Sequence, residues 1–283
     1  MAKETKKTPD EKSIPWHTAF FEAIQMELDE YGQDLQFISE FPLNTQPLKI
    51  DVVIIKKSRD ITIEKNIASF FRKENIVEYK SPEDYVSVRD FYKVYGYACL
   101  YGALNKVDIK DLTLTFVESR HPRELLKHLQ EVRGYTVEER LPGIYIIRGD
   151  ILPIQIIDNR RLSEEENIWL KDLDNRLNTP KMRRITTEIH KLGKDKITRI
   201  KAYLDVIARA NIGTLEEVIK MSDSSLALEK IFEEVGWIAK WEARGRNEGR
   251  EEVARNALAQ GASPDFVQKI TGLDMQTITS LRD

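Results

Sequence analysis

Three charged residues stand in two short segments that otherwise have the apolar pattern of buried strands. They are Asp51 in the first segment and, 27 positions later, Glu78 in the second, followed by Lys80. A charge in a buried strand is costly unless it is paired or ligates a metal. Because side chains alternate along a strand, Glu78 and Lys80 share one face and Tyr79 points to the other. If the two strands are neighbours, Asp51, Glu78 and Lys80 converge in the outline of a magnesium-and-lysine hydrolytic site.

The elements that must position these residues follow from hydrophobic periodicity and turn residues. We expect a helix over 16–31 that ends at Gly32, and a further helix that is capped by Ser81 and runs over 88–104. Strands are predicted over 35–41, 48–55, 76–82 and 112–117. They are followed by a helix over 121–132, a hairpin over 135–147 and a last strand over 152–157.

After Asp158 the pattern becomes helical, with predicted capping residues at Ser163 and Thr214 and a long charged helix over 226–259. Two short helices are expected around Gly272. The predicted organisation is a flexible tail over 1–13, a domain over 14–158, a helical region over 159–260 and a small helical module over 261–283. The fold class is α/β: a mixed sheet flanked by helices, followed by a mostly α-helical C-terminal region.

Composition excludes some classes of protein. The apolar share is 41%, yet no apolar run reaches the roughly 20 residues that a membrane span needs. The chain has one cysteine, Cys99, which excludes an intrachain disulfide and a zinc cage built from several cysteines. The first residues are charged, with no hydrophobic segment behind them. We therefore expect a cytoplasmic protein without a membrane partner. A net charge of -3 neither supports nor opposes binding to nucleic acid.

The segments 47–57 and 71–82 resemble the bacterial branch of the PD-(D/E)XK nuclease superfamily, whose members are described as recombination-promoting nucleases or putative transposases. The glycine-containing charged segment 242–250 and the tail 261–281 are similar to the C-terminal region of that branch. The family's Pro-Asp pair is Ile50-Asp51 here, a change that leaves the carboxylate in place. The resemblance implies a restriction-endonuclease-like fold and a metal-dependent DNA endonuclease linked to recombination, mobile elements or phage defence.

Hydrolysis of a phosphodiester bond suits the residues of this motif. Mg²⁺, or Mn²⁺ in its place, prefers hard oxygen ligands, which makes Asp51 the expected central ligand, Glu78 the second and the Tyr79 carbonyl a third. Lys80 would orient the attacking water and offset charge in the transition state. Many family members add a glutamate from the first helix. Glu27 flanks the apolar stripe of that helix, and we favour it over Glu22, which lies nearly opposite the stripe.

Other interpretations remain open. Asp51 and Lys80 could form a structural ion pair in a catalytically inactive interaction module that oligomerises through its C-terminal helices, with a homodimer as the simplest case. A transposase-like strand-transfer protein could use the same metal site. The tail could be a helix-turn-helix DNA reader over 275–281, although it has no basic face, and a self-association module fits it better.

Several side chains have a simpler interpretation. The tyrosines of 91–101 could stack on bases, but their helical spacing favours core packing. Cys99 is expected to be a small buried hydrophobe. The four histidines, His17, His121, His128 and His190, lack the spacing of metal ligands and are expected to serve surface or packing roles.

Overall fold

The computed structural model describes residues 14–39, 52–193, 196–197, 200–221, 249–259 and 262–281. Asp51 and the predicted tail over 1–13 lie outside the described residues, as does most of the predicted helix over 226–259. The chain forms two compact units, Met1–Met221 and Ser222–Asp283. Within the described residues, no helix is long and apolar enough to cross a membrane.

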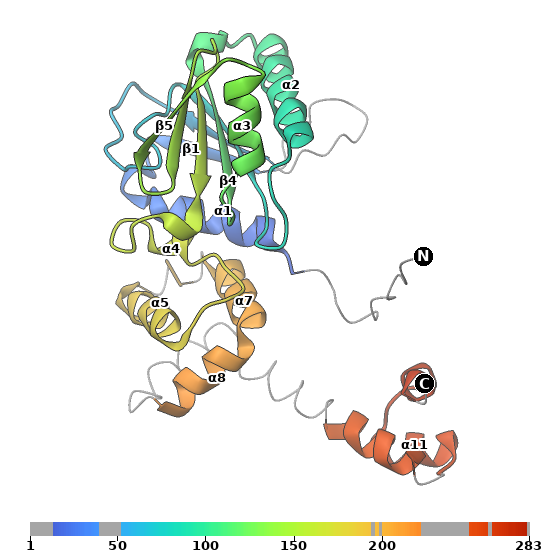
Figure 1. Cartoon of the computed structure of the whole chain (residues 1–283). Helices are drawn as coiled ribbons and strands as arrows, with labels where there is room; N and C mark the ends of the chain where they lie inside the picture. Colours follow the sequence, from blue (N-terminus) through green and yellow to red (C-terminus); the bar gives the residue numbers. More distant parts are fainter. Residues whose placement is uncertain are drawn as a thin grey trace. The chain divides into compact units, whose positions relative to one another are not determined.

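The first unit is built on one seven-stranded mixed sheet with the order β1-β2-β3-β4-β7-β6-β5 (Figure 1). β3 is parallel to β4 and β4 to β7, whereas the remaining neighbours are antiparallel. The strands are β1 Leu35–Ser39, β2 Val52–Lys57, β3 Glu74–Tyr79, β4 Leu112–Glu118, β5 Thr136–Leu141, β6 Ile144–Arg148 and β7 Ile154–Asp158. The predicted strands and the hairpin are thus confirmed, and so is the α/β fold with a mixed sheet flanked by helices.

Two helices cover one face of the sheet. α2 (Val88–Asn105) connects the parallel strands β3 and β4, and α3 (Arg123–Glu131) packs beside it. Their apolar stripes meet the even-numbered side chains of the central strands, such as Ile76, Phe116 and Ile156, in one buried cluster. Odd-numbered residues of β3 therefore point to the other face, as strand alternation requires.

That other face is covered by α1 (Trp16–Glu27), a helix followed by one 3-10 turn, Asp29–Tyr31. Phe20 of α1 stacks on Tyr79 of β3 with ring centroids 4.5 Å apart. The short helix α4 (Ile168–Lys171) and α7 (Lys201–Ala210) pack against α1 in turn. α5 (Thr179–Lys191) packs against α8 (Ile212–Met221).

The helical segment after residue 158 therefore belongs to the same compact unit as the sheet, which differs from the predicted division at 158 and 159. The composition changes there because the last strand, β7, ends. The packing of α4 and α7 on α1 nevertheless continues the unit to Met221.

Three predicted helix caps are wrong, and tertiary contacts explain why. Ser81 begins a turn instead, and the next segment is held against β4 because the Val86 N–H donates to Glu118 Oε2 at 3.1 Å. The predicted helix over 88–104 is confirmed as α2, and its N-cap is Ser87. Ser163 lies in a turn before α4, and Thr214 lies inside α8, where its hydroxyl donates to the Leu177 carbonyl at 3.0 Å.

The second unit contains a helical segment at 249–259 followed by α11 (Pro264–Thr271) and α12 (Met275–Ser280). The two predicted tail helices are confirmed, with Gly272 between them in the left-handed conformation at φ 68°. Ala254, Val267 and Ile278 form the small buried core of the described part. α12 contains no lysine or arginine, so it lacks the basic face of a DNA-reading helix.

Candidate active site at the carboxyl edge of the parallel strands

β3 places Glu78 and Lys80 on the face of the sheet that α2 covers. β2 is its antiparallel neighbour, and the Cα of Val52 lies opposite that of Glu78. The two motif strands are thus neighbours. Asp51 itself lies outside the described residues, and it is bonded directly to Val52. We call this end of the sheet, where β3, β4 and β7 finish, the carboxyl edge.

Lys80 is surrounded by carboxylates. Its Nζ lies 3.0 Å from Asp90 Oδ1, 3.6 Å from Asp84 Oδ2 and 3.7 Å from Glu78 Oε1. Burial opposes the charge on Lys80, but the hydrogen bond to Asp90 and the three negative charges outweigh this effect and raise the Lys80 pKa. The side chain therefore stays cationic at neutral pH, which suits it to neutralising charge rather than to removing a proton.

The start of α2 positions the closest of these partners. Ser87 and Asp90 form a capping box, in which the Asp90 N–H donates to Ser87 Oγ at 3.1 Å and the Ser87 N–H donates to Asp90 Oδ2 at 3.0 Å. The second carboxylate oxygen of Asp90 remains to accept the hydrogen bond from Lys80. The cap thus ties Lys80 to the start of α2.

Two further carboxylates lie at the carboxyl edge and were missed in the sequence. Glu118 ends β4 and Asp158 ends β7, and their Cα atoms are direct partners across the two parallel strands. Both lie on the α2 face by strand alternation and are buried, with 0% and 3% of their surface exposed. Glu118 Oε1 and Asp158 Oδ1 have no hydrogen-bond partner among the described residues.

Burial raises the pKa of Glu118 to about 8, and the nearby charge of Asp158 adds to the increase. The hydrogen bond from the Val86 N–H lowers the pKa but does not offset these effects. Burial likewise raises the pKa of Asp158, which Arg161 and His121 oppose. Carboxyl groups with such pKa values are common at functional sites. The sequence contained a signal for both acids, because each stands at the end of an apolar strand. The carboxyl ends of parallel strands form a shared ligand-binding edge, so acids at these positions are candidate site residues.

The donor types at the carboxyl edge suit a magnesium ion. Glu78 and Glu118 offer hard carboxylate oxygens on one face of two neighbouring strands, and one Glu118 oxygen is unpartnered. Among the described residues, no group of three His, Cys, Asp or Glu side chains is arranged to hold a metal. Mg²⁺ keeps several waters and needs only one or two carboxylates from the protein, so Glu78 is a candidate ligand.

The structure does not bring Glu27, the predicted catalytic glutamate of the first helix, to Glu78 and Lys80. It is buried on the opposite face of the sheet, where Oε2 pairs with Lys65 Nζ at 2.8 Å and Oε1 accepts from the Leu170 N–H at 2.9 Å. The alternative, Glu22, accepts from the Tyr203 N–H at 2.6 Å. Both side chains attach α1 to other elements of the unit, because α1 packs on the Tyr79 face.

Glu27→Ala is therefore expected to destabilise the fold by about 3 kcal/mol, because Lys65 loses its ion-pair partner and the buried Leu170 N–H loses its acceptor. Chemical denaturation would measure this change in the free energy of unfolding. Glu30→Ala, at an exposed position three residues along, is the matched control and should change stability little. A loss below about 1 kcal/mol for Glu27→Ala would contradict the structural role.

Other predicted side chains also have clear positions. Tyr79 is fully buried on the opposite face of the sheet, where its ring stacks on Phe20, so only its backbone carbonyl is a candidate ligand. Tyr101 lies in the core as expected, whereas Tyr92 is partly exposed. The prediction for Cys99 is wrong: it is exposed, because the buried stripe of α2 passes through Ala98 instead.

Two of the histidines contact tyrosines. His121 Nδ1 lies 3.1 Å from the Tyr145 hydroxyl, and His128 Nε2 lies 2.9 Å from the Tyr92 hydroxyl. These contacts are consistent with packing roles.

Comparison of the chain with family models, with curated proteins and with solved structures finds no match.

Proposed function

We propose that this protein is a metal-dependent DNA endonuclease that hydrolyses phosphodiester bonds at the carboxyl edge. One observation supports this most directly: Glu78 and Lys80 lie 3.7 Å apart on one face of β3, beside the strand that follows Asp51. A partly buried lysine that stays positively charged next to carboxylates is what phosphate chemistry requires, because negative charge increases during phosphoryl transfer.

The proposed roles follow from these positions. Asp51, Glu78 and the Tyr79 carbonyl would hold Mg²⁺ or Mn²⁺, which supplies Lewis-acid activation of water and of the phosphoryl group when bound. Lys80 holds the attacking water in line and offsets charge on the phosphoryl oxygens. Glu118, with its raised pKa, can keep a proton at neutral pH and donate a hydrogen bond from the neighbouring strand.

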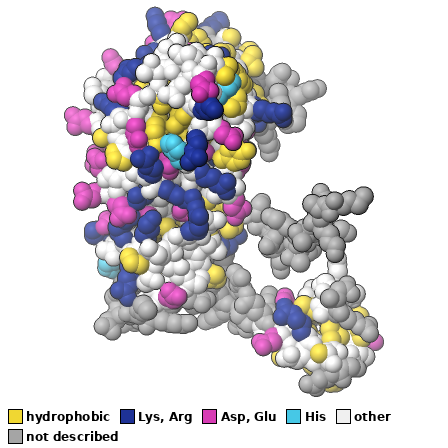
Figure 2. Space-filling view, in the orientation of Figure 1, with side chains coloured by type: hydrophobic (Ala, Val, Ile, Leu, Met, Phe, Trp, Pro, Cys, Tyr) yellow, Lys and Arg dark blue, Asp and Glu magenta, His cyan; other side chains and the backbone are white. Residues whose placement is uncertain are grey.

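DNA is the proposed substrate, and basic side chains support its binding. Figure 2 shows Lys and Arg side chains gathered across the middle of the visible face, at the height of α4 in Figure 1. Arg160 and Arg161 directly follow the end of β7, where they pair with Asp174 and Glu139. Such local basic surfaces bind phosphate backbones even where the net charge of the chain is negative. Roles in recombination, mobile elements or phage defence, and a cytoplasmic location, belong to the same proposal.

Cleavage of supercoiled plasmid by purified full-length protein tests the function. We expect nicking or linearisation with Mg²⁺ or Mn²⁺, none with EDTA, and loss of at least about a hundredfold in rate for Asp51→Ala and Glu78→Gln. Glu83→Gln, an exposed acid in the turn after β3, is the matched control and should cut like wild type. Absence of cleavage by well-folded wild type with either metal would overturn the proposal.

A second candidate is an inactive interaction module that self-associates through its C-terminal helices. The observation that favours it is a set of large hydrophobic side chains exposed in the second unit, each at least 38% accessible: Val253, Phe266, Ile270 and Met275. Phe266 and Ile270 are four residues apart, so they share one face of α11. A homodimer through this unit is compatible with nuclease activity, since two sites suit the cutting of both strands.

A further inference from the structure

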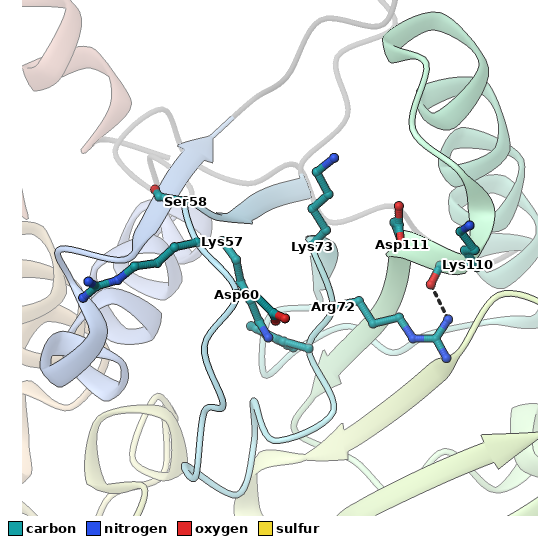
Figure 3. Close-up of a pocket in the computed structure, with 9 residues that line it drawn as sticks. Lys57, Ser58, Asp60, Arg72, Lys73, Lys110 and Asp111 are labelled. Atoms are coloured by element: carbon teal, nitrogen blue, oxygen red, sulfur yellow. Dashed lines mark hydrogen bonds between the residues drawn. The ribbon is translucent and has the colours of Figure 1, made fainter.

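A pocket of about 610 Å³ lies at the opposite end of the sheet from the carboxyl edge (Figure 3). It forms where β2 ends and where β3 and β4 begin, and its lining includes Lys57 from the last position of β2 and Phe71, a buried aromatic, as an apolar wall. A pocket of this volume is the size that holds a small-molecule ligand.

The charge of the lining is strongly unbalanced. Only two acids, Asp60 and Asp111, contribute to it. Five cations line the same space, namely Lys57, Arg59, Arg72, Lys73 and Lys110.

Most of these cations are not neutralised by a carboxylate. Lys57 Nζ donates to the Ile61 carbonyl at 2.8 Å, and Arg72 donates to the Lys110 carbonyl, contacts that orient the side chains but leave their charges uncompensated. Among the residues that the structure describes, Lys73 Nζ has no ion pair, and Lys110 has only an exposed contact of 3.3 Å with Asp108. Arg59 is paired with Asp34, which is not part of the lining.

The position of Arg72 is set from inside the fold. The fully buried Asn75 accepts from the Arg72 N–H at 2.8 Å and donates to its carbonyl at 2.9 Å, and it also donates to the Ile55 carbonyl at 3.0 Å. This buried amide ties the loop before β3 to β2. The basic pocket is thus held in place without a ligand, which lowers the entropy lost on binding.

We propose that this pocket binds the phosphate groups of a nucleotide, either free or as part of a nucleic-acid strand. Several cations around a concave, partly apolar site match two or more adjacent phosphate charges, and Phe71 can contact the uncharged part of the ligand. The pocket is separate from the proposed hydrolytic site, and its function does not depend on that site.

Calorimetric titration of the full-length protein with inorganic pyrophosphate at low salt, in EDTA, tests the proposal. We expect wild type to bind, and the double variant Lys73→Ala/Lys110→Ala to bind at least about tenfold more weakly. Lys73→Arg/Lys110→Arg keeps the charges and should retain most of the affinity. Lys127→Ala/Lys191→Ala removes two exposed helix lysines that pair with Glu131 and Glu188, and it is the control for net charge.

Absence of binding to wild type, or equal weakening in the pocket variant and the control, would overturn the proposal. ATP and a dT10 oligonucleotide, titrated in the same way, distinguish the two sources of phosphate. Tighter binding of ATP assigns the pocket to a free nucleotide, and tighter binding of dT10 assigns it to a strand. EDTA removes any dependence on metal, so failure of plasmid cleavage and failure of this binding are separate results.

Discussion

Lys80→Ala is expected to lower plasmid cleavage by roughly a hundredfold or more, because it removes the cation whose Nζ lies 3.7 Å from Glu78 Oε1. Loss of a charged donor aimed at a developing negative charge has effects of this size, since the transition state then loses one of the groups that stabilise it. The variant also leaves Asp90 without its closest partner, at 3.0 Å, so some stability is lost as well. Initial rates on supercoiled plasmid, with unfolding curves for each protein, measure both effects.

Asp90→Asn separates the catalytic from the structural interpretation. It weakens the tie between Lys80 and the start of α2 but leaves Lys80 and Glu78 in place, and the asparagine side-chain oxygen can still accept the Ser87 N–H of the capping box. If Lys80 acts on the phosphate, Asp90→Asn should retain most of the cleavage that Lys80→Ala loses. Equal loss in the two variants, in step with equal destabilisation, would show that Lys80 serves only to hold α2 on the sheet.

Glu118→Gln is expected to stabilise the protein at pH 9 by on the order of a few kcal/mol and to change stability little at pH 5. Burial raises the folded-state pKa of Glu118 to about 8, whereas the unfolded chain ionises near the ordinary value of 4.5. Between these values the folded state holds a proton that the unfolded state has lost. Stability of the wild type therefore falls as the pH rises from about 4.5 to about 8, and glutamine removes this dependence.

Denaturant unfolding at several pH values between 5 and 9 measures the effect, as the difference in slope between wild type and Glu118→Gln. Glu83→Gln again provides the control, because its exposed side chain should leave the slope unchanged. Parallel curves for wild type and Glu118→Gln would contradict the raised pKa. The same variant tested for cleavage would show whether the buried proton contributes to the reaction.

The local pattern of the sequence was sufficient to predict the strands and the shared face of Glu78 and Lys80. Alternation of apolar residues predicted the strands that became β2, β3 and β4, and it placed Glu78 and Lys80 on one face. The tail helices followed from local signals, because Gly272 and Asp274 act on their immediate neighbours. Such features depend on the backbone geometry of a few neighbouring residues. They therefore do not depend on where the segment lies in the fold.

Helix starts were predicted less well where a distant residue competed. Ser81-Pro82 has the local pattern of a helix cap, yet Ser87 caps α2. The segment before Ser87 is held against β4 because the Val86 N–H donates to Glu118, 32 residues away. Cys99 was wrongly predicted to be buried, because α2 contains more hydrophobic residues than can face the core.

The sequence by itself determined the α/β character of the chain and the shared face of Glu78 and Lys80. Only the tertiary structure decided which other charges join them. β4 and β7 lie next to β3 in the sheet, which brings Glu118 and Asp158 to the carboxyl edge, while α1 packs on the opposite face and removes Glu27 from it. The physical reason is that strand order and helix placement arise from contacts between residues far apart in the chain, whereas periodicity reports only which side of its own element a residue occupies.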